Sequence, residues 1–279
     1  MDFPSFSRRQ WLAATAATVA AATLPRPAWA AGAPQAKLGI QLYSLRGYNV
    51  NDALQHAADL GFDEVEFYSG MLPINSTPEQ IAEIKKRVSD LGMSISAHGV
   101  NHFGGDAAAN RKLFEFAKAL GVPTITADPE PTAFDSLDDL VDEFDIRIAI
   151  HNHGPSARYN QVVDVLKAIE GHDERIGACA DLGHYIRSGQ EPVEVIRSLK
   201  GRLYGVHLKD FAEMKEHTKG VVLGQGHLDV EGVFVAMQDV GFPANGALSL
   251  EYEEDPSNPL AEIRQCVTIA NAAMEKVSA

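Results

Sequence analysis

Short apolar segments alternate with amphipathic segments along most of the chain. The apolar segments have the length and composition of buried strands, and they lie at residues 37–43, 65–67, 94–97, 124–127, 146–150, 176–180, 203–208 and 247–250. Apolar residues recur at helical spacing in residues 51–60, 77–91, 106–120, 136–144, 160–170, 192–200, 230–240 and 259–277. The pattern therefore predicts a regular succession of strand–helix units.

The predicted helices carry the residues that begin and end helices. Thr77-Pro78 and Pro192 stand at expected first turns, where a capping hydroxyl and a fixed backbone angle favour a helix start. Gly61 and Gly121 directly follow two expected last turns, where glycine tolerates the left-handed conformation that ends a helix. These boundaries support the pattern independently of hydrophobicity.

Strands joined by helices in this way run parallel to one another. About eight such units in about 250 residues predict a single-domain (β/α)8 TIM barrel. The alternative is an open doubly wound sheet, but a flavodoxin-like sheet would use fewer units. The first predicted strand is followed by Gln-Leu-Tyr-Ser-Leu-Arg at residues 41–46, which lacks the glycines of a dinucleotide-binding turn.

The first thirty residues have the pattern of a twin-arginine export signal. Arg8-Arg9 precedes an Ala- and Thr-rich apolar run that ends near Leu24, and Ala28 and Ala30 are small residues at an expected cleavage site. A membrane anchor is the alternative, but the run is shorter than the roughly 20 residues that a spanning helix needs. We therefore expect a signal peptide at residues 1–30, a barrel at residues 31–279, periplasmic localisation and no stable membrane insertion after cleavage.

The acidic net charge disfavours nucleic acid as a partner, and the two cysteines do not suggest a disulfide framework. The net charge is −14, and an acidic surface repels nucleic acid phosphates. Cys179 lies in a predicted strand and Cys266 in the last predicted helix, so both are expected to be buried free thiols. A small-molecule ligand is expected instead of nucleic acid.

Polar and titratable residues gather where the predicted strands end. They are Glu66, His98, Asp128, His151, Asn152, His153, Asp181, His184, His207, Lys209, Asp210, Glu251 and Glu253. Any one of them is as well explained as a helix cap. The carboxyl ends of barrel strands form the active-site face, however, and imidazoles with carboxylates suit a divalent transition metal. The sequence therefore predicts a metal site at this face.

These residues occur in motifs that resemble the xylose isomerase-like barrels, the sugar phosphate isomerase/epimerase group. The motifs are Gly-Phe-Asp-Glu-Val-Glu at 61–66, Ser-Ala-His at 96–98, Asp-Leu-Gly-His at 181–184, Val-His-Leu-Lys-Asp at 206–210, Leu-Gly-Gln-Gly-His-Leu-Asp at 223–229 and Leu-Glu-Tyr at 250–252. The resemblance covers nearly the whole chain after the leader. It implies a TIM barrel that acts on a carbohydrate with one divalent metal ion, such as Mn, Co, Mg, Fe or Zn.

The resemblance also implies roles for individual residues. The metal ligands would be His151, Asp181, His207 and Glu251; the catalytic residues Glu251, His151 and Lys209; and the substrate-binding residues Glu66, His98 and His184. Sugar epimerases of this group place a glutamate where this chain has His151. Because those enzymes move one proton between two glutamates, His151 is here either a metal ligand or a base.

The expected activity is that of a metal-dependent sugar isomerase or epimerase that removes a proton next to a metal-chelated carbonyl. Two alternatives remain. A periplasmic lyase or hydrolase of 3-keto-glycosides would use the same proton abstraction to expel a leaving group. A sugar-binding barrel without catalysis would not need Asp181, His207 and Glu251 together.

Overall fold

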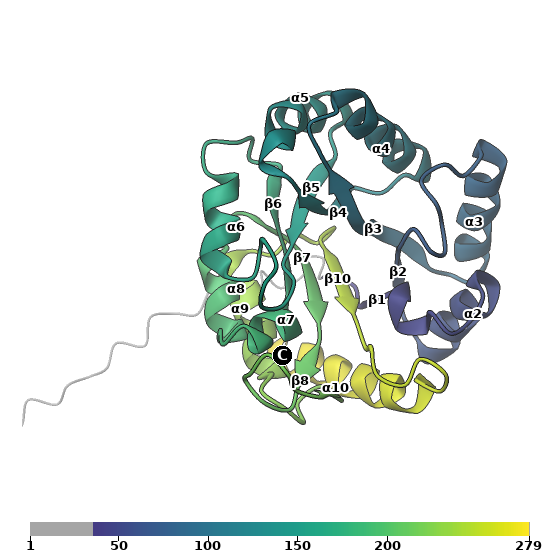
Figure 1. Cartoon of the computed structure of the whole chain (residues 1–279). Coiled ribbons are helices and arrows are strands. Elements are labelled where there is room, and N and C mark those ends of the chain that lie inside the picture. The colour runs from purple at the N-terminus through teal and green to yellow at the C-terminus, as the bar shows by residue number, and fades with distance from the viewer. Residues whose placement is uncertain (1–35, 279) are drawn as a thin grey trace, which may run out of the picture.

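The computed structural model describes residues 36–278, which form a closed barrel of eight parallel strands. The strands follow one another around the barrel in the order β1-β10-β7-β6-β5-β4-β3-β2, as Figure 1 shows in a view down the barrel. Their bounds are β1 Gly39–Gln41, β2 Glu64–Phe67, β3 Ser94–Phe103, β4 Thr124–Pro129, β5 Arg147–His151, β6 Ile176–Asp181, β7 Leu203–Leu208 and β10 Ala247–Leu250. The predicted (β/α)8 barrel is therefore confirmed. The predicted leader lies outside the described residues.

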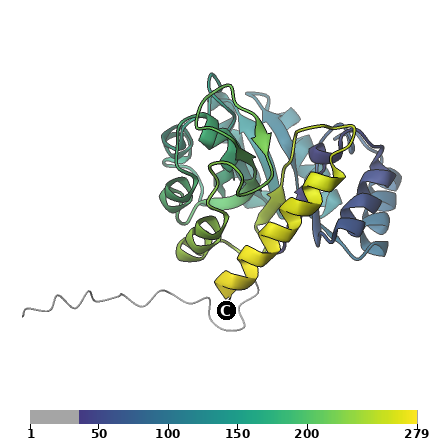
Figure 2. The same ribbon diagram turned by 90° about the horizontal axis from the view of Figure 1, so that it is seen from below.

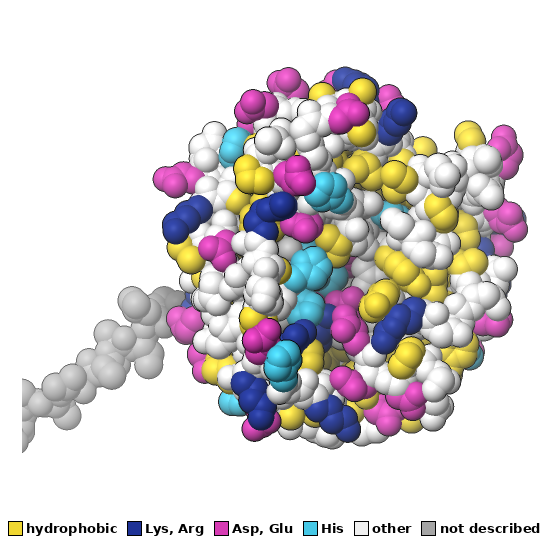
Figure 3. Space-filling model, viewed as in Figure 1, with side chains coloured by type: hydrophobic (Ala, Val, Ile, Leu, Met, Phe, Trp, Pro, Cys, Tyr) yellow, Lys and Arg dark blue, Asp and Glu magenta, His cyan; other side chains and the backbone are white. Residues whose placement is uncertain are grey.

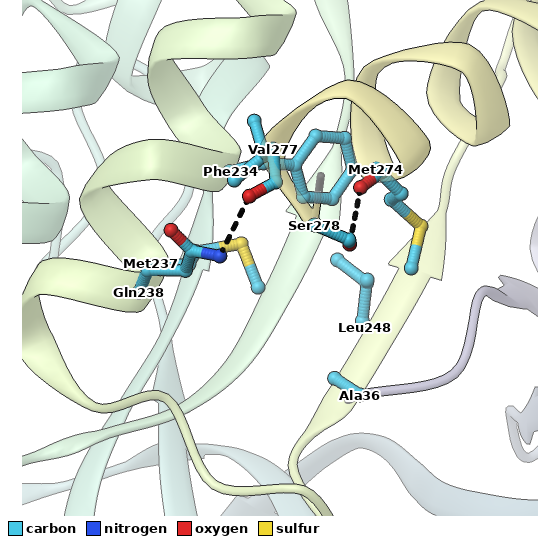
Figure 4. A pocket seen from close by; sticks show the side chains of 8 residues that line it. All are labelled: Ala36, Phe234, Met237, Gln238, Leu248, Met274, Val277 and Ser278. Atoms are coloured by element: carbon cyan, nitrogen blue, oxygen red, sulfur yellow. Dashed lines mark hydrogen bonds between the residues drawn. The ribbon is translucent and has the colours of Figure 1, made fainter. Parts of the chain in front are cut away.

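Helices surround this barrel, and the helix α10 closes the ring. The α-helices are α2 Val50–Leu60, α3 Pro78–Asp90, α4 Ala107–Leu120, α5 Phe134–Phe144, α6 Val162–Ile169, α7 Leu182–Arg187, α8 Pro192–Ser198, α9 Val230–Val240 and α10 Leu260–Ser278. Figure 2 shows α10, in yellow, between the first helices and the later ones. A small apolar cavity of about 30 Å³ lies where α10 packs against α9 and β10, lined by Phe234, Leu248 and Met274 among others (Figure 4).

The predicted helix boundaries have the expected physical basis. Thr77 and Gln80 form a reciprocal capping box at the start of α3, which satisfies two backbone N–H groups. Gly61 and Gly121 end α2 and α4 at φ values of 88° and 85°, a conformation that favours glycine. Local sequence thus determines where these helices start and stop.

Two segments at the carboxyl ends of the strands differ from the prediction. The strand expected at residues 94–97 continues to Phe103, with a register shift against β4 between His98 and Asn101. The strand expected at residues 37–43 is short, and a 3₁₀ helix, η1 Leu42–Leu45, follows it directly. Polar residues interrupt the apolar pattern at residues 98–102, whereas apolar residues continue past the end of β1 at Leu42 and Tyr43. Periodicity alone therefore placed one strand end too early and the other too late.

Some short elements were not predicted. The short helix α7 follows β6 directly, and β8 Asp210–Phe211 pairs antiparallel with β9 Gly220–Val221 beside the barrel.

Both thiols are buried and free, as expected for Cys179 and Cys266. Within residues 36–278, none of the helices combines the length and apolar character that crossing a membrane requires.

Candidate metal centre and pocket

Four titratable side chains meet at the carboxyl ends of neighbouring barrel strands. Ligand atoms of His151, Asp181, His207 and Glu251 all lie within 4.8 Å of one another, and all four residues are buried. Figure 3, viewed down the barrel, shows histidines and acidic side chains gathered at its centre. We call these four residues the metal-binding cluster, because together they could hold a metal ion.

Strand register brings the cluster together. Asp181 pairs with His207 across β6 and β7, and the backbone N–H of Glu251 donates to Leu208 O at the end of β7. Asp181 also caps α7, since its Oδ1 accepts the His184 N–H at 2.7 Å. The helix therefore begins at the residue that faces the cluster, and this fixes the direction of the Asp181 carboxylate.

The imidazole of His207 is oriented from beneath by a carboxylate. His207 Nε2 donates to Glu66 Oε2 at 2.9 Å, and Nδ1 lies 3.1 Å from both Glu251 Oε2 and His151 Nε2. Burial alone would lower the pKa of His207, but surrounding groups that include Glu66 and Glu251 raise it well above its usual value. The ring therefore presents Nδ1 to the centre of the cluster.

Lys209 supplies positive charge to the same centre. Its Nζ lies 2.8 Å from Asp181 Oδ2, 2.7 Å from Glu251 Oε2 and 2.9 Å from Glu253 Oε1. Burial would raise the pKa of Glu251, but Lys209 and His207 outweigh it and hold that pKa well below its usual range. A Cβ at Gly183 would lie 2.5 Å from Lys209 Cγ, so a glycine there leaves room for the lysine stem.

The donor set fits a divalent cation. Two imidazoles and two carboxylates converge. The carboxylates are stabilised by the Lys209 ammonium and by the His207 ring, which is positively charged when both of its nitrogens carry a proton. A divalent ion would supply comparable positive charge at the same atoms, and it would compete with the His207 proton. His151 Nδ1 is buried with no hydrogen-bond partner within residues 36–278, so its ring is not committed to another structural contact on that side.

A pocket of about 420 Å³ opens above the cluster. It is lined by Gln41, Tyr43, Tyr68, Ser69, Gly99, Val100, His151, His153, His184, Glu251 and Glu253. His151 and Glu251 therefore belong both to the cluster and to the pocket wall, whereas Asp181 and His207 are fully buried behind it. A ligand in the pocket would meet one imidazole and one carboxylate of the cluster.

Two further imidazoles in the pocket wall are neutral at neutral pH. Burial, together with the neighbouring His151, lowers the pKa of His153 to about 4. Burial likewise lowers the pKa of His184 to about 3. Neutral imidazoles each present one donor and one acceptor, so this wall can hydrogen-bond hydroxyl groups without adding charge.

Two predicted substrate-binding residues lie elsewhere. Glu66 is completely buried, and its carboxylate accepts from Thr126 Oγ1, Ser249 Oγ and His207. His98 is 1% exposed, with Nε2 at 2.9 Å from Leu72 O and Nδ1 at 3.1 Å from Asn101 Nδ2. Neither lines the pocket, because Glu66 lies in the barrel interior beneath the cluster and His98 turns toward Leu72 and Phe116. Of the three predicted substrate contacts, only His184 lines the pocket.

Other strand-end residues have separate tasks. Asn152 holds the backbone of Asp181 through two hydrogen bonds of 3.0 and 2.8 Å. Asp210 accepts from Gly224, Gly226 and Leu228 and so fixes the following loop. Asp128 lies near Arg158, with 3.5 Å between the carboxylate and the guanidinium. These residues support the face without joining the cluster.

Sequence reasoning missed the wall formed by the first three strands. Gln41, Tyr43, Tyr68 and Val100 line the pocket at the ends of β1, β2 and β3. Their only sequence signal was position, because each lies next to a predicted strand end, and a search for metal ligands ignores neutral side chains. Glu253 was noted at a strand end but was given no role.

Comparisons with known proteins agree with this architecture. A family model described as xylose isomerase-like TIM barrel matches residues 54–269. An inosose dehydratase from Clostridium botulinum (strain Eklund 17B / Type B) is 30% identical over 142 residues, which is 44% of this chain and 47% of that protein. The match thus spans less than half the length of this curated relative.

Two solved structures illustrate the likeness in three dimensions. A putative uncharacterised protein from Parabacteroides distasonis ATCC 8503 is 27% identical, with a TM-score of 0.67 over 85% of this chain and 98% of that one. A D-psicose 3-epimerase from Clostridium cellulolyticum H10, solved with D-tagatose, has a TM-score of 0.67 at 15% identity, over 85% of this chain and 99% of that one. The second likeness shows the shared fold.

Proposed function

The chain belongs to the xylose isomerase-like TIM barrel family, and we propose that it is a metal-dependent carbohydrate lyase. Its reaction would remove a proton next to the carbonyl of a keto-sugar and then expel an oxygen-linked group from the adjacent carbon. The metal-binding cluster would hold one divalent ion, which supplies Lewis-acid chemistry when bound. The side chains of the pocket would accept the proton and bind the substrate.

The observation that carries this proposal is the one-sided placement of carboxylates. Glu251 and Glu253 are the carboxylates in the pocket wall, and both follow β10. The wall from the first three strands offers Gln41, Tyr43, Tyr68 and Ser69 instead. Epimerisation requires proton exchange on both faces of one carbon, whereas elimination requires one carboxylate base on one face. The sequence similarity to inosose dehydratases, whose name describes removal of water, also supports elimination.

Glu251 is assigned as the proton acceptor. It lines the pocket, and Lys209 keeps it ionised through a 2.7 Å ion pair. Lys209 would then balance the charge that moves between Glu251 and the substrate oxygen. His151 is assigned as a metal ligand, because its Nε2 faces the cluster and lies 3.1 Å from His207 Nδ1.

The neutral imidazoles of His153 and His184 are assigned to the substrate hydroxyls, because each ring offers one hydrogen-bond donor and one acceptor. In the balanced step, the C–H proton passes to Glu251, the C–H electrons form a carbon–carbon double bond, and the C–O bond breaks. The departing oxygen takes one proton from solvent water and leaves as an alcohol or water, and Glu251 returns its proton to solvent. The 3-keto-glycosides fit this chemistry, since their acidic proton at C2 lies between the carbonyl at C3 and the glycosidic oxygen at C1. No oxidant or reductant is needed.

Isomerisation is the second candidate, because a proton transferred between neighbouring carbons on one face also needs one base. Both reactions share the first step, so deuterium exchange from D₂O at the carbon next to the carbonyl tests proton abstraction itself. Methyl 3-keto-β-glucopyranoside, incubated with Mn²⁺- or Co²⁺-loaded protein, is the probe. Elimination predicts release of methanol and an unsaturated ketone that absorbs in the ultraviolet.

The outcomes separate the candidates. Exchange without methanol release, together with formation of an isomeric ketose from a free sugar, would favour isomerisation. A lack of exchange in both substrate types, with metal bound, would contradict either enzyme and leave the sugar-binding barrel. Glu251→Gln should suppress exchange, whereas Glu262→Gln, in the first turn of α10, serves as the control.

A further inference from the structure

The pocket wall that faces β6 across the barrel is uncharged and partly apolar. β2 and β6 lie four strands apart in the eight-stranded ring, so side chains at their ends face one another across the barrel mouth. We define the aromatic wall as Tyr43, Tyr68 and Val100, which line the pocket after β1, after β2 and within β3. Figure 3 shows hydrophobic side chains on the side of the central hollow opposite the histidines.

This wall brings exposed apolar side chains together at the pocket mouth. Within residues 36–278, four large hydrophobic side chains are exposed, and two of them, Tyr43 at 39% and Val100 at 36%, line this pocket. Single exposed hydrophobic residues need no explanation, but a group at the mouth of a polar pocket indicates a ligand surface.

Tyr43 is held rigidly at the rim. Its ring meets the Tyr68 ring edge-on with centroids 5.3 Å apart, and Arg46 Cζ lies 4.5 Å from the Tyr43 centroid. Arg46 donates to Tyr43 O at 3.0 Å and to Glu253 O at 2.6 Å. A Cβ at Gly70 would lie 2.3 Å from Tyr68 Cε2, so only a glycine lets this turn approach the ring. A preorganised ring loses little entropy when a ligand binds.

A bulge in β3 positions Val100 beside the tyrosines. The register against β4 shifts between His98 and Asn101, which interrupts regular pairing around Val100. Gln41 Nε2 donates to Gly99 O at 3.3 Å, and Asn101 Nδ2 donates to His98 O at 2.9 Å. The bulge is therefore fixed on both sides, which also explains why His98 is buried in the barrel wall.

The chemistry of this wall selects an uncharged ligand. The lining residues of β1, β2 and β3 are neutral, and the nearby Arg46 guanidinium is already bonded to two carbonyl oxygens. A phosphate or carboxylate here would lack a dedicated cation. The ring of a neutral sugar has an apolar C–H face that packs on tyrosine, while its hydroxyls suit Gln41, Ser69 and the tyrosine hydroxyls.

We propose that the aromatic wall is a second sugar subsite, so that the substrate is an uncharged glycoside with two sugar rings. The keto ring would lie at the metal-binding cluster, and the second ring, the leaving group, would pack on Tyr43, Tyr68 and Val100. The pocket of about 420 Å³ lies within the range that holds ligands larger than a single sugar ring. This inference rests on the proposed function for placing a keto ring at the cluster and for calling the second ring a leaving group.

Binding of unreactive glycosides tests the subsite apart from catalysis. Cellobiose and methyl β-glucopyranoside lack a keto group, so neither can undergo the reaction. We expect the protein to bind cellobiose about tenfold or more tightly than the methyl glycoside, the usual worth of one packed aromatic anchor. Tyr43→Ala should abolish this preference, Tyr43→Phe should retain most of it, and Val163→Ala, at an exposed residue of α6, should leave it unchanged. Calorimetry measures all four proteins.

Turnover gives a second, separable readout. With 3-keto-cellobiose and methyl 3-keto-β-glucopyranoside, Tyr43→Ala should lower kcat/KM about tenfold more for the first substrate than for the second. Equal binding of both glycosides by the unmodified protein, or an equal loss for both keto substrates in Tyr43→Ala, would overturn the subsite. A preserved cellobiose preference without α-proton exchange would instead contradict the proposed function and leave the subsite standing. Preferential binding of glucose 6-phosphate over cellobiose would also overturn the proposed sugar subsite.

Discussion

His207 Nε2 lies 2.9 Å from Glu66 Oε2, and Glu66 is completely buried beneath the metal-binding cluster. Two hydroxyls hold the Glu66 carboxylate in place, because Thr126 Oγ1 and Ser249 Oγ donate to it at 2.6 and 2.7 Å. A carboxylate that accepts from one ring nitrogen leaves the other nitrogen free to bind metal and fixes the plane of the ring. Glu66 is thus placed to orient His207.

Glu66→Gln should weaken metal binding about 10–100-fold, the usual effect of losing a carboxylate that supports a histidine ligand. Titration with Mn²⁺ or Zn²⁺ by calorimetry measures the change directly, and nitrogen NMR shifts of His207 report whether each of its ring nitrogens is protonated in the metal-free protein. Glu64→Gln is a matched control, since Glu64 lies on the same strand and contacts Ser94 instead of a histidine. Unchanged metal affinity and unchanged protonation of the His207 ring nitrogens in Glu66→Gln would contradict the positioning role.

Asp181→Asn should reduce metal affinity by more than the 10–100-fold expected for a supporting residue, because a ligand atom itself loses its charge. The asparagine oxygen can still cap α7 at the His184 N–H, so the barrel should remain folded. Metal content by atomic emission and circular dichroism measure the two effects. Asp128→Asn, at the same face but near Arg158, should retain metal. Full metal occupancy in Asp181→Asn would remove Asp181 from the ligand set.

Variants of His151 test whether this residue is a metal ligand or a catalytic base. As a ligand, its replacement in His151→Ala should weaken metal binding, and His151→Glu should restore it, because glutamate supplies an oxygen donor at the end of β5. As a base, its loss would leave metal in place and cost roughly 10²–10⁴-fold in rate. Metal titration and single-turnover rates on the same preparations decide between these outcomes. We expect the ligand result, since His151 Nε2 faces His207 Nδ1.

Acid stability should depend on Asp173 at the opposite end of the barrel. A hydrogen bond from Arg175, opposed by partial burial, lowers the pKa of Asp173 to about 2. Because this pKa lies below the unfolded value of about 3.9, the contribution to stability is present above about pH 4 and is lost as the pH falls toward 2.

Asp173→Asn should therefore lower Tm at pH 7, and the difference from the unmodified protein should shrink as the pH falls from 4 to 2. Thermal unfolding at a series of pH values measures it. Asp139→Asn, an exposed carboxylate of α5, should show no such convergence. If the Tm difference between Asp173→Asn and the unmodified protein is the same at every pH, the ionised Asp173 carboxylate is not the source of the stability.

Export remains a prediction from the leader alone. Replacing Arg8-Arg9 with Lys-Lys should leave full-length protein in the cytoplasm, because the twin-arginine route recognises that pair. Cell fractionation and immunoblotting locate the protein, and replacing Arg26 with Lys is the control within the same leader. Normal periplasmic recovery of the Lys-Lys variant would contradict the assignment.

The sequence by itself determined the fold and the members of the metal-binding cluster. The fold follows from local signals, namely the spacing of apolar residues, Thr77-Pro78 at a helix start and the glycines after helices. Eight strand–helix units can bury their apolar faces in only a few architectures, and the closed barrel is one of them. Strand ends in a parallel barrel share one face, so listing them placed His151, Asp181, His207 and Glu251 on that face. The resemblance to the xylose isomerase-like barrels then singled these four out as metal ligands.

Only the tertiary structure decided what the other strand-end residues do. Glu66 and His98 stand at strand ends like the ligands, yet packing turns His98 toward Leu72 and Phe116. Glu66 instead lies beneath the cluster, where it meets His207, 141 residues away in sequence. The aromatic wall likewise depends on contacts between η1, the turn after β2 and the bulge in β3. Such contacts follow from the relative orientation of whole strands, which no local pattern encodes.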